Sequence, residues 1–308
     1  MNRPIKDNSQ RSAEVVAGSA DWALSRLGLG TVQFGLGYGI SNELGQTDRA
    51  EVAAILEQAA GLGMRVLDTA PSYGEAERVL GESMPRASTW DIITKTRPGA
   101  VNNVTADFEA SCRHLKRENL YGVLVHHVED LLGVNGERLM DSLRELKQMG
   151  RLRKIGISDY DGEQIDAVLD RFHIDLIQVP VNVLDQRLVR SGHLKKLKQA
   201  GVEIHCRSVF LQGLLMIAPD RLPRQFNTVR ENIAAYHDAL HCRGMSAQAG
   251  ALGFVRGIPQ LDVIIIGVNS LAHLRENVAA YQQAEGLDYS AFAVDDRSVL
   301  DPREWSRP

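Results

Sequence analysis

The sequence has few cysteines, and their positions exclude two classes of protein. Only three of the 308 residues are cysteines, Cys112, Cys206 and Cys242, and no two of them form a C-x-x-C pair. An odd number of widely spaced cysteines predicts neither a disulfide framework nor a zinc ribbon. The set is typical of a chain in the reducing cytoplasm.

The sequence also lacks an excess of charge and long apolar runs. Its 35 Lys and Arg and 39 Asp and Glu residues give a formal net charge of -4, which is no signature of nucleic-acid or anionic-membrane binding. No run approaches the roughly 18 apolar residues of a membrane span, and residues 1–21 lack the apolar stretch of a secretory signal. We therefore expect a cytoplasmic protein with small-molecule or protein partners.

Several functional motifs are absent as well. The chain contains neither G-x-S-x-G nor the phosphate-binding G-x-x-x-x-G-K-[ST]. The glycine-rich segment 28–33 places Gln33 where a dinucleotide-binding G-x-G-x-x-G has its third glycine. His126, His127, Glu129 and Asp130 are possible metal ligands, but no second cluster matches them. We predict no metal site.

Composition and periodicity predict the fold class. Hydrophobic residues make up 44% of the chain and charged residues 24%, as in ordinary globular proteins. Short apolar runs with strand character alternate with segments of helical spacing. The predicted strands are 27–32, 65–68, 91–95, 121–126, 154–157, 175–178, 203–207 and 262–266. The predicted helices are 49–62, 75–82, 105–116, 137–149, 162–172, 193–200, 232–243 with 247–256, and 271–284.

The connections between these elements favour a parallel sheet. Glycines such as Gly150 and Gly201 follow predicted helices, and the next strand begins within a few residues. Eight such units in about 250 residues predict an α/β protein of one domain, a (β/α)8 or TIM barrel. A doubly wound open sheet is the alternative. We expect the barrel at 25–285, a polar N-terminal extension at 1–24 and a C-terminal tail at 286–308.

Four titratable residues stand at or just beyond the carboxyl ends of predicted strands, where barrel enzymes build their active sites. Asp68, Lys95 and His126 close apolar strands, and Tyr73 follows Asp68 in the segment TAPSYG. Each alone has an ordinary structural explanation, such as a turn cap or a core histidine. A lysine in an apolar strand, however, requires a carboxylate partner, which Asp68 on the neighbouring strand can supply. Long loops at 33–47, 127–136 and 208–230 lie at the same predicted face.

Six segments of the chain resemble the aldo-keto reductase superfamily. They are LGLGTVQFG (27–35), RVLDTAPSYGEAERVLGE (65–82), ITKT (93–96), LVHH (124–127), KIGISD (154–159) and IIGVNSLAHLREN (265–277). LDTAPSYG is the most specific of them. The resemblance implies an NAD(P)-dependent oxidoreductase that interconverts a carbonyl and an alcohol, with an aldehyde, ketone or sugar as substrate. It implies NADPH as the cofactor, with NADH as the alternative.

The same resemblance makes Asp68, Tyr73, Lys95 and His126 the catalytic residues. Hydride addition to a carbonyl leaves negative charge on its oxygen, so a proton donor is needed there. Tyr73 would supply this proton, and Lys95 would lower the pKa of the phenol. Asp68 would keep Lys95 charged, and a neutral His126 would orient the carbonyl.

The resemblance also implies a set of cofactor contacts. Gly30 and Thr31 would lie beneath the nicotinamide, and its carboxamide would be held from three positions, Ser158, Asp159 and Gln178. The loop after the seventh strand would meet the pyrophosphate through Ser208, Leu211 and Gly213. The rest of the set comprises Arg207, Gly267, Val268, Asn269, His273, Glu276 and Asn277.

Four positions depart from the pattern of this superfamily. Asp159 stands where Asn is usual, and Arg207 stands where an aromatic ring usually stacks on the nicotinamide. Gly267 and His273 replace the Lys and Arg that many NADPH-using members direct at the 2′-phosphate. With Arg275 as the obvious remaining cation, we expect weak discrimination between NADPH and NADH.

Two other functions are compatible with such a barrel. One is a cofactor-binding regulatory or redox-sensing protein with little turnover. The other is a barrel isomerase without a cofactor. Measurements of turnover and of nicotinamide binding distinguish both from a reductase.

Overall fold

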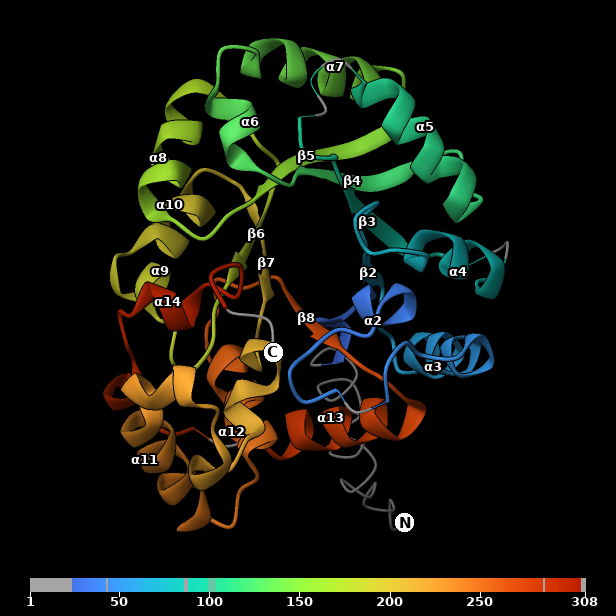
Figure 1. Cartoon of the computed structure of the whole chain (residues 1–308). Coiled ribbons are helices and arrows are strands. Elements are labelled where there is room, and N and C mark those ends of the chain that lie inside the picture. Colours follow the sequence, from blue (N-terminus) through green and yellow to red (C-terminus); the bar gives the residue numbers. More distant parts are fainter. Residues whose placement is uncertain are drawn as a thin grey trace, which may run out of the picture.

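The computed structural model describes residues 24–42, 44–85, 88–99, 101, 103–284 and 286–305 (Figure 1). The N-terminal extension predicted at 1–24 lies outside these residues except for Leu24, which is buried. The account that follows concerns the described residues.

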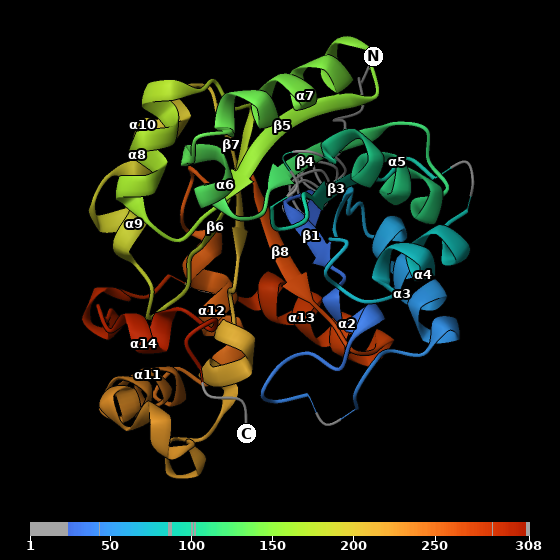
Figure 2. The same ribbon diagram turned by 45° about the horizontal axis from the view of Figure 1, so that its top comes forward.

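Eight parallel strands form a closed barrel in which each strand pairs with its neighbour in sequence and β1 pairs with β8. Figure 2 shows β1 and β8 side by side although they lie near opposite ends of the chain. This closure confirms the predicted TIM barrel and contradicts the open sheet, which would leave two unpaired edges. The strands are β1 (Leu27–Gly30), β2 (Val66–Asp68), β3 (Asp91–Lys95), β4 (Leu120–Val125), β5 (Leu152–Ser158), β6 (Leu176–Pro180), β7 (Glu203–Arg207) and β8 (Val263–Gly267).

The helices lie around the outside of the barrel (Figure 1). Asp48, Asp161 and Ser246 accept hydrogen bonds from backbone N–H groups in the first turns of α3, α8 and α12, as N-terminal caps do. No helix in the described part of the chain has the length and apolar character needed to cross a bilayer. The helices that alternate with the strands are α3 (Arg49–Gly61), α4 (Ala76–Ser83), α5 (Val104–Leu115), α7 (Gly136–Gln148), α8 (Gly162–Arg171), α10 (His193–Gln199), α11 (Arg230–His241), α12 (Ala247–Arg256) and α13 (Leu271–Gln283).

Two hydrophobic clusters form the core. The larger one lies between the strands and the surrounding helices, whereas a smaller one fills the barrel interior because alternate strand residues point inward. Gly28 leaves room for this interior cluster, since a Cβ there would lie 2.8 Å from Cδ1 of Ile265. The interior cluster consists of Val66, Ile93, Leu124, Leu176, Val263 and Ile265.

Short helices interrupt the long loops predicted at the carboxyl face of the barrel. The first strand ends at Gly30 rather than at residue 32 because the chain turns into α2 there. Each of these helices is too short to show a helical period in the sequence. They are α2 (Val32–Gly35), α6 (Val128–Leu132) and three 3₁₀ helices, η2 (Leu211–Met216), η3 (Pro219–Arg221) and η4 (Arg224–Val229). A further short helix, α9 (Arg187–Arg190), lies in the connection after β6, which was not predicted as a long loop.

The segment predicted as a C-terminal tail packs onto the barrel. It contains η5 (Ser290–Phe292) and α14 (Arg297–Leu300), and the side chains of Phe292, Val299 and Leu300 are buried in the larger cluster. The N–H of Val294 donates to the carbonyl of Leu184 at 2.9 Å. The tail therefore shares the barrel's core, and the boundary at residue 285 stays a prediction.

Candidate active site

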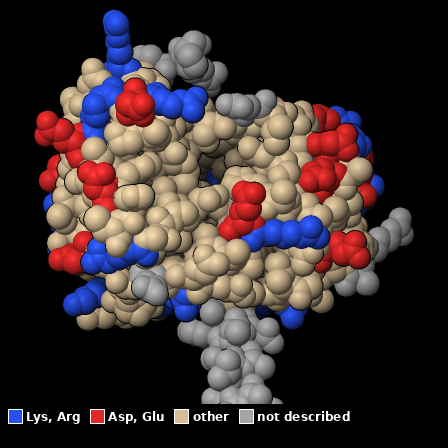
Figure 3. All heavy atoms as spheres, turned by 90° about the horizontal axis from the view of Figure 1, so that it is seen from below, with Lys and Arg blue, Asp and Glu red and all other residues tan. Residues whose placement is uncertain are grey.

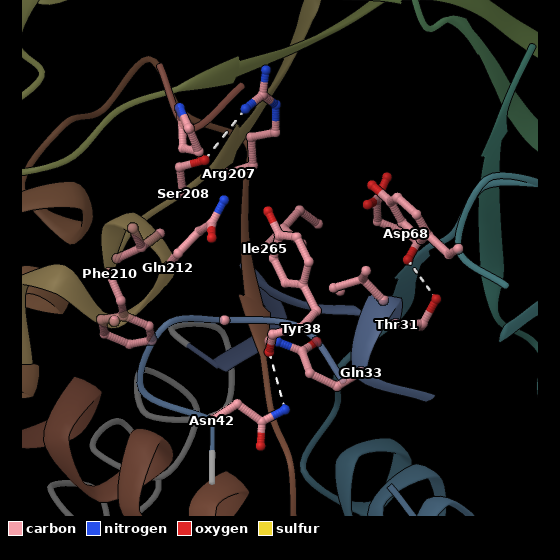
Figure 4. A pocket seen from close by; sticks show the side chains of 18 of the residues that line it. Thr31, Gln33, Tyr38, Asn42, Asp68, Arg207, Ser208, Phe210, Gln212 and Ile265 are labelled. Atoms are coloured by element: carbon pink, nitrogen blue, oxygen red, sulfur yellow. Dashed lines mark hydrogen bonds between the residues drawn. The ribbon is translucent and has the colours of Figure 1, made fainter. Parts of the chain in front are cut away.

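A cavity of about 320 Å³ opens at the carboxyl ends of the barrel strands. Figure 3 shows a hollow near the middle of this face, and Figure 4 shows part of the lining. Much of the lining comes from the segments that follow β1 and β7. The four titratable residues singled out in the sequence all line this cavity: Asp68, Tyr73, Lys95 and His126.

Asp68 and Lys95 form a buried ion pair between β2 and β3. The Lys95 Nζ lies 2.6 Å from Oδ1 of Asp68 and also donates to the carbonyl of Thr69 at 3.0 Å. Asp68 is 4% exposed and Lys95 only 2%. Burial lowers the pKa of Lys95, and the charge of Asp68 opposes this effect. The carboxylate thus favours the charged form of an amine that water does not reach.

Two further side chains hold Asp68 in place. Gln178, at the middle of β6, donates from Nε2 to Oδ1 of Asp68 at 2.8 Å. The hydroxyl of Thr31 donates to the backbone carbonyl of Asp68 at 2.9 Å. The sequence resemblance assigned both residues to the cofactor, and the structure adds this contact with the ion pair. The Oε1 of Gln178 is buried and has no partner among the described residues.

Tyr73 occupies a turn between β2 and α4, and a close approach of α2 fixes that turn. The Tyr73 N–H donates to Ala70 at 3.0 Å, and the Tyr73 carbonyl accepts from Ala76 at 3.1 Å. Gly35, the last residue of α2, lies against this turn. A Cβ on Gly35 would lie 1.9 Å from the Tyr73 carbonyl oxygen, so only glycine fits at this position.

The tyrosine ring lies beside the lysine, with Nζ of Lys95 4.9 Å from the Tyr73 ring centroid. Burial and then the charge of Asp68 raise the pKa of Tyr73 well above its ordinary value, while Arg207 opposes them. The rise is a net effect of burial and Asp68, so the lowering expected from Lys95 stays a prediction. The loss of hydration and the negative charge of Asp68 both disfavour the phenolate. Tyr73 is therefore a protonated acid throughout the neutral range.

His126 follows β4 on the same wall of the cavity. Burial, and next the charge of Lys95, lower the pKa of His126 to about 3. Its Nδ1 is buried without a partner among the described residues. His127 lies next to it, with the two ring centroids 5.2 Å apart. At neutral pH His126 is an uncharged imidazole that can hydrogen-bond a substrate oxygen without adding charge.

Comparison with known families agrees with this arrangement. The sequence model described as the aldo/keto reductase family matches residues 26–293. The chain belongs to the aldo/keto reductase family. It is accordingly an NAD(P)-dependent oxidoreductase of the aldo-keto reductase type.

Individual relatives are distant but extend over most of the chain. The NADH-specific methylglyoxal reductase of Escherichia coli is 26% identical over 87% of this chain and 93% of its own length. L-galactose dehydrogenase of Arabidopsis thaliana is 25% identical over 91% of this chain and 94% of its own length. The holo structure of an aldo-keto reductase from Bacillus halodurans superposes with a TM-score of 0.71 at 20% identity, covering 91% and 95% of the two chains. The structural similarity supports the fold.

Most of the cofactor contacts implied for this aldo/keto reductase line the cavity. Two residues of its lining, Gln178 and Asn269, carry buried side-chain oxygens that have no partner among the described residues. Such acceptors fit the amide and hydroxyl donors of a nicotinamide nucleoside. The residues of the implied set that line the cavity are Gly30, Thr31, Ser158, Gln178, Arg207, Ser208, Gly213, Gly267, Asn269 and His273.

Five implied cofactor contacts do not line the cavity: Asp159, Leu211, Val268, Glu276 and Asn277. Asp159 accepts the backbone N–H groups of Tyr160 and Asp161 at 2.6 and 3.3 Å and so closes its own loop. Burial raises the pKa of Asp159 to about 6. Asn277 is fully buried, and neither polar atom of its side chain has a partner among the described residues. Their roles toward the cofactor stay predictions.

The loop after β7 has an unusual backbone. Ser208, Leu211 and Gln212 have φ values of 58°, 47° and 54°, and Gly213 has 93°. Such left-handed conformations are uncommon for residues other than glycine, and they cluster at ligand-binding segments. The carbonyl of Gln212 accepts from the N–H of Ile40 at 3.1 Å, which joins this loop to the loop after β1.

The cavity residues that the sequence analysis missed include Tyr160 and Arg303. The ring centroid of Tyr160 lies 4.0 Å from the guanidinium carbon of Arg207 and 4.2 Å from that of Arg303. Tyr160 directly follows the KIGISD segment, so an extension of that motif by one residue would have included it. Arg303 had no signal, because it follows α14 in the tail rather than a strand.

Proposed function

We propose that this aldo/keto reductase reduces the carbonyl of a small aldehyde, ketone or sugar, with Tyr73 as the general acid. The observation that carries the proposal is the convergence of a protonated Tyr73, the Lys95–Asp68 ion pair and the neutral His126 in one cavity. A nicotinamide cofactor, when bound, supplies the hydride. The residues that would hold it are those of the implied set that line the cavity.

The proton transfer follows from the ionisation of the four residues. Tyr73 keeps its proton at neutral pH and donates a hydrogen bond to the carbonyl oxygen. As charge develops on that oxygen, the oxygen becomes more basic than the phenolate and takes the proton. The ammonium of Lys95, held by Asp68, stabilises the phenolate that remains. His126 donates a second hydrogen bond and fixes the direction of the carbonyl.

A turnover assay tests this function. Aldehydes, ketones and sugars are supplied with NADH or NADPH, and loss of nicotinamide absorbance is measured. A reductase consumes cofactor at a rate that saturates with substrate. Cofactor binding without turnover on the whole panel would favour a regulatory or redox-sensing barrel instead. If neither cofactor quenches protein fluorescence, a barrel without a cofactor is favoured.

The choice of cofactor is expected to be weak and to depend on pH. The side chain of Gln33 lies where a Cβ on Gly267 would go, so no lysine fits there without a shift. The carboxylate of Glu51 accepts from the N–H of Leu271 at 2.6 Å and places negative charge at the start of α13. Gly267 therefore offers no cation to a 2′-phosphate, and the charge of Glu51 opposes its binding near His273. We expect affinities for NADPH and NADH within about tenfold.

The pH dependence follows from the ionisation of His273. Burial lowers the pKa of His273, so its imidazole is cationic only in acid solution. If it contacts the 2′-phosphate, His273→Gln should weaken NADPH binding at about pH 5.5 and change nothing at about pH 8, where the imidazole is neutral. NADH binding should be unaffected at both values. Comparison at equal pH is needed because the phosphate itself titrates near about pH 6.

Fluorescence titrations of the two proteins with both cofactors provide the measurement. Glu51→Gln is the reciprocal variant, because removal of its charge should strengthen NADPH binding more than NADH binding. A strong NADPH preference that is equal at both pH values and survives His273→Gln would contradict the prediction. Arg275 on the same helix would then be the residue to replace next.

A further inference from the structure

One cationic side chain in the cavity lacks an acidic partner, and this bears on the substrate of the proposed reductase. The ionisable groups of the lining, besides histidines and tyrosines, are Asp68, Lys95, Arg207 and Arg303. Asp68 and Lys95 neutralise each other at 2.6 Å. The remaining charge in the cavity therefore depends on the two arginines.

Arg303 has its own carboxylate outside the lining. Its Nε and Nη2 donate to the two oxygens of Asp301 at 2.9 and 2.6 Å, a bidentate pair. The hydrogen bonds from Arg303, with a smaller contribution from Arg207, outweigh burial and lower the pKa of Asp301. Both oxygens of the Asp301 carboxylate thus accept hydrogen bonds from Arg303, and Asp301 neutralises the charge of that arginine.

Arg207 has no carboxylate within ion-pair distance in the described part of the chain. Its Nη1 donates to the Ser208 hydroxyl at 3.3 Å (Figure 4), and its guanidinium carbon lies 4.0 Å from the Tyr160 ring centroid. A neutral hydroxyl and an aromatic face compensate a partly buried guanidinium only in part. Most of its five N–H donors remain available to a ligand.

The guanidinium also lies close enough to the catalytic residues to act on their ionisation. After burial and Asp68, which raise the pKa of Tyr73, the charge of Arg207 is the next influence, and it lowers that pKa. The same charge adds to burial and Lys95 in lowering the pKa of His126. Arg207, Tyr73 and His126 line the same cavity, so a group bound by Arg207 would share that cavity with the carbonyl on which Tyr73 acts.

We propose that Arg207 binds an anionic group, a carboxylate or a phosphate, carried by the carbonyl substrate. The planar guanidinium matches the two oxygens of such a group, and Tyr160 restrains its orientation by stacking. The anion would neutralise the uncompensated charge in the cavity. The substrate class is then an oxo acid or a phosphorylated aldehyde rather than a neutral aldehyde. This inference rests on the proposed reductase activity.

A phosphate of the cofactor is the other possible source of the anion, and the experiment separates the two. Values of kcat/KM are measured for 4-oxobutanoate against its uncharged methyl ester and for glyceraldehyde 3-phosphate against glyceraldehyde. The enzymes are the wild type, Arg207→Met and Arg207→Lys. Arg303→Met is the matched control, because that arginine contacts the same ring but has its own carboxylate. Cofactor affinities of all four proteins are measured by fluorescence titration.

The wild type should prefer the charged member of at least one pair by about tenfold or more. Arg207→Met should remove that preference by lowering kcat/KM for the charged member more than for the uncharged member. Because Arg207 is also an implied cofactor contact, a change in cofactor affinity alone would lower kcat/KM for both members of a pair equally. Arg207→Lys should retain part of the preference, and Arg303→Met should retain most of it. Retention of the preference also shows that a variant is folded.

Three results would overturn the inference. The first is a wild type that turns over carbonyls without preferring either charged member. The second is an Arg207→Met enzyme that has lower cofactor affinity and an equal loss of kcat/KM for both members of each pair. That result would assign Arg207 to a cofactor phosphate. The third is an equal loss of preference in Arg303→Met. Failure of the wild type to turn over any carbonyl is a different outcome, because it contradicts the reductase activity itself.

Discussion

Replacement of Tyr73 by phenylalanine is expected to lower kcat by about 10² to 10⁴ while cofactor affinity stays nearly unchanged. The variant keeps the ring beside Lys95, at 4.9 Å from Nζ, and removes only the hydroxyl that donates the proton. The high pKa of Tyr73 strengthens the expectation, because the lost group is the protonated acid at neutral pH. Steady-state kinetics on the best carbonyl substrate and a fluorescence titration with cofactor measure the two quantities.

Tyr121→Phe provides a control with the same chemical change. The hydroxyl of Tyr121 donates to Oε2 of Glu203 at 2.8 Å, near the amino ends of β4 and β7 and away from the cavity. Its loss should leave kcat close to that of the wild type. A Tyr73→Phe enzyme with more than about half of wild-type activity would exclude Tyr73 as the general acid, since a positioned acid contributes far more than twofold.

Lys95→Met is expected to be nearly inactive and less stable by about 3 to 5 kcal/mol, the usual cost of removing one partner from a buried pair. The substitution leaves the Asp68 carboxylate, 4% exposed, with Gln178 as its remaining side-chain donor. It also removes the ammonium beside Tyr73. Denaturant unfolding measures the free energy of unfolding, and kcat/KM measures the loss of activity.

Two comparisons make this prediction specific. Lys147→Met breaks the ion pair with Asp175, in which the lysine side chain is 38% exposed. This substitution should lower the free energy of unfolding by about 1 kcal/mol or less. Asp68→Asn and the double variant Asp68→Asn/Lys95→Met complete a cycle. Because the two residues act as a pair, the double variant should lose less stability and less activity than the two single variants lose together. Additive losses would mean that the residues act independently.

The strands and long helices could be predicted because the residues that they bury form recognisable apolar patterns in the sequence. Residues 91–95 and 203–207 were predicted as strands with the bounds that β3 and β7 have, and 247–256 as the helix α12. A parallel strand buried on both faces is a continuous apolar run between turn residues, and this signal is local. The short helices in the loops have no comparable signal, because they are held by contacts with other parts of the fold.

The part of the candidate site that could be predicted consists of residues whose positions the barrel itself determines. Asp68, Lys95 and His126 end neighbouring strands, and the fold alone brings such residues to one rim. The contact between Tyr160 and Arg303 depends on how the tail packs, and no local pattern encodes it. The raised pKa of Tyr73 was not predictable, because the sequence shows neither the burial of the phenol nor its interaction with the charge of Asp68.

The pairing of β1 with β8 has a consequence for synthesis of the protein. Leu27 to Gly30 find their partners at Ile264 to Gly267, so the barrel cannot close until nearly the whole chain has left the ribosome. During that interval β1 and the most recently added strand present open edges that can pair with other chains. Asp68, Tyr73 and Lys95 are translated early but face a complete cavity only after closure. A chain truncated before β8 would therefore leave the edge of β1 unpaired and would lack a closed barrel around its catalytic residues.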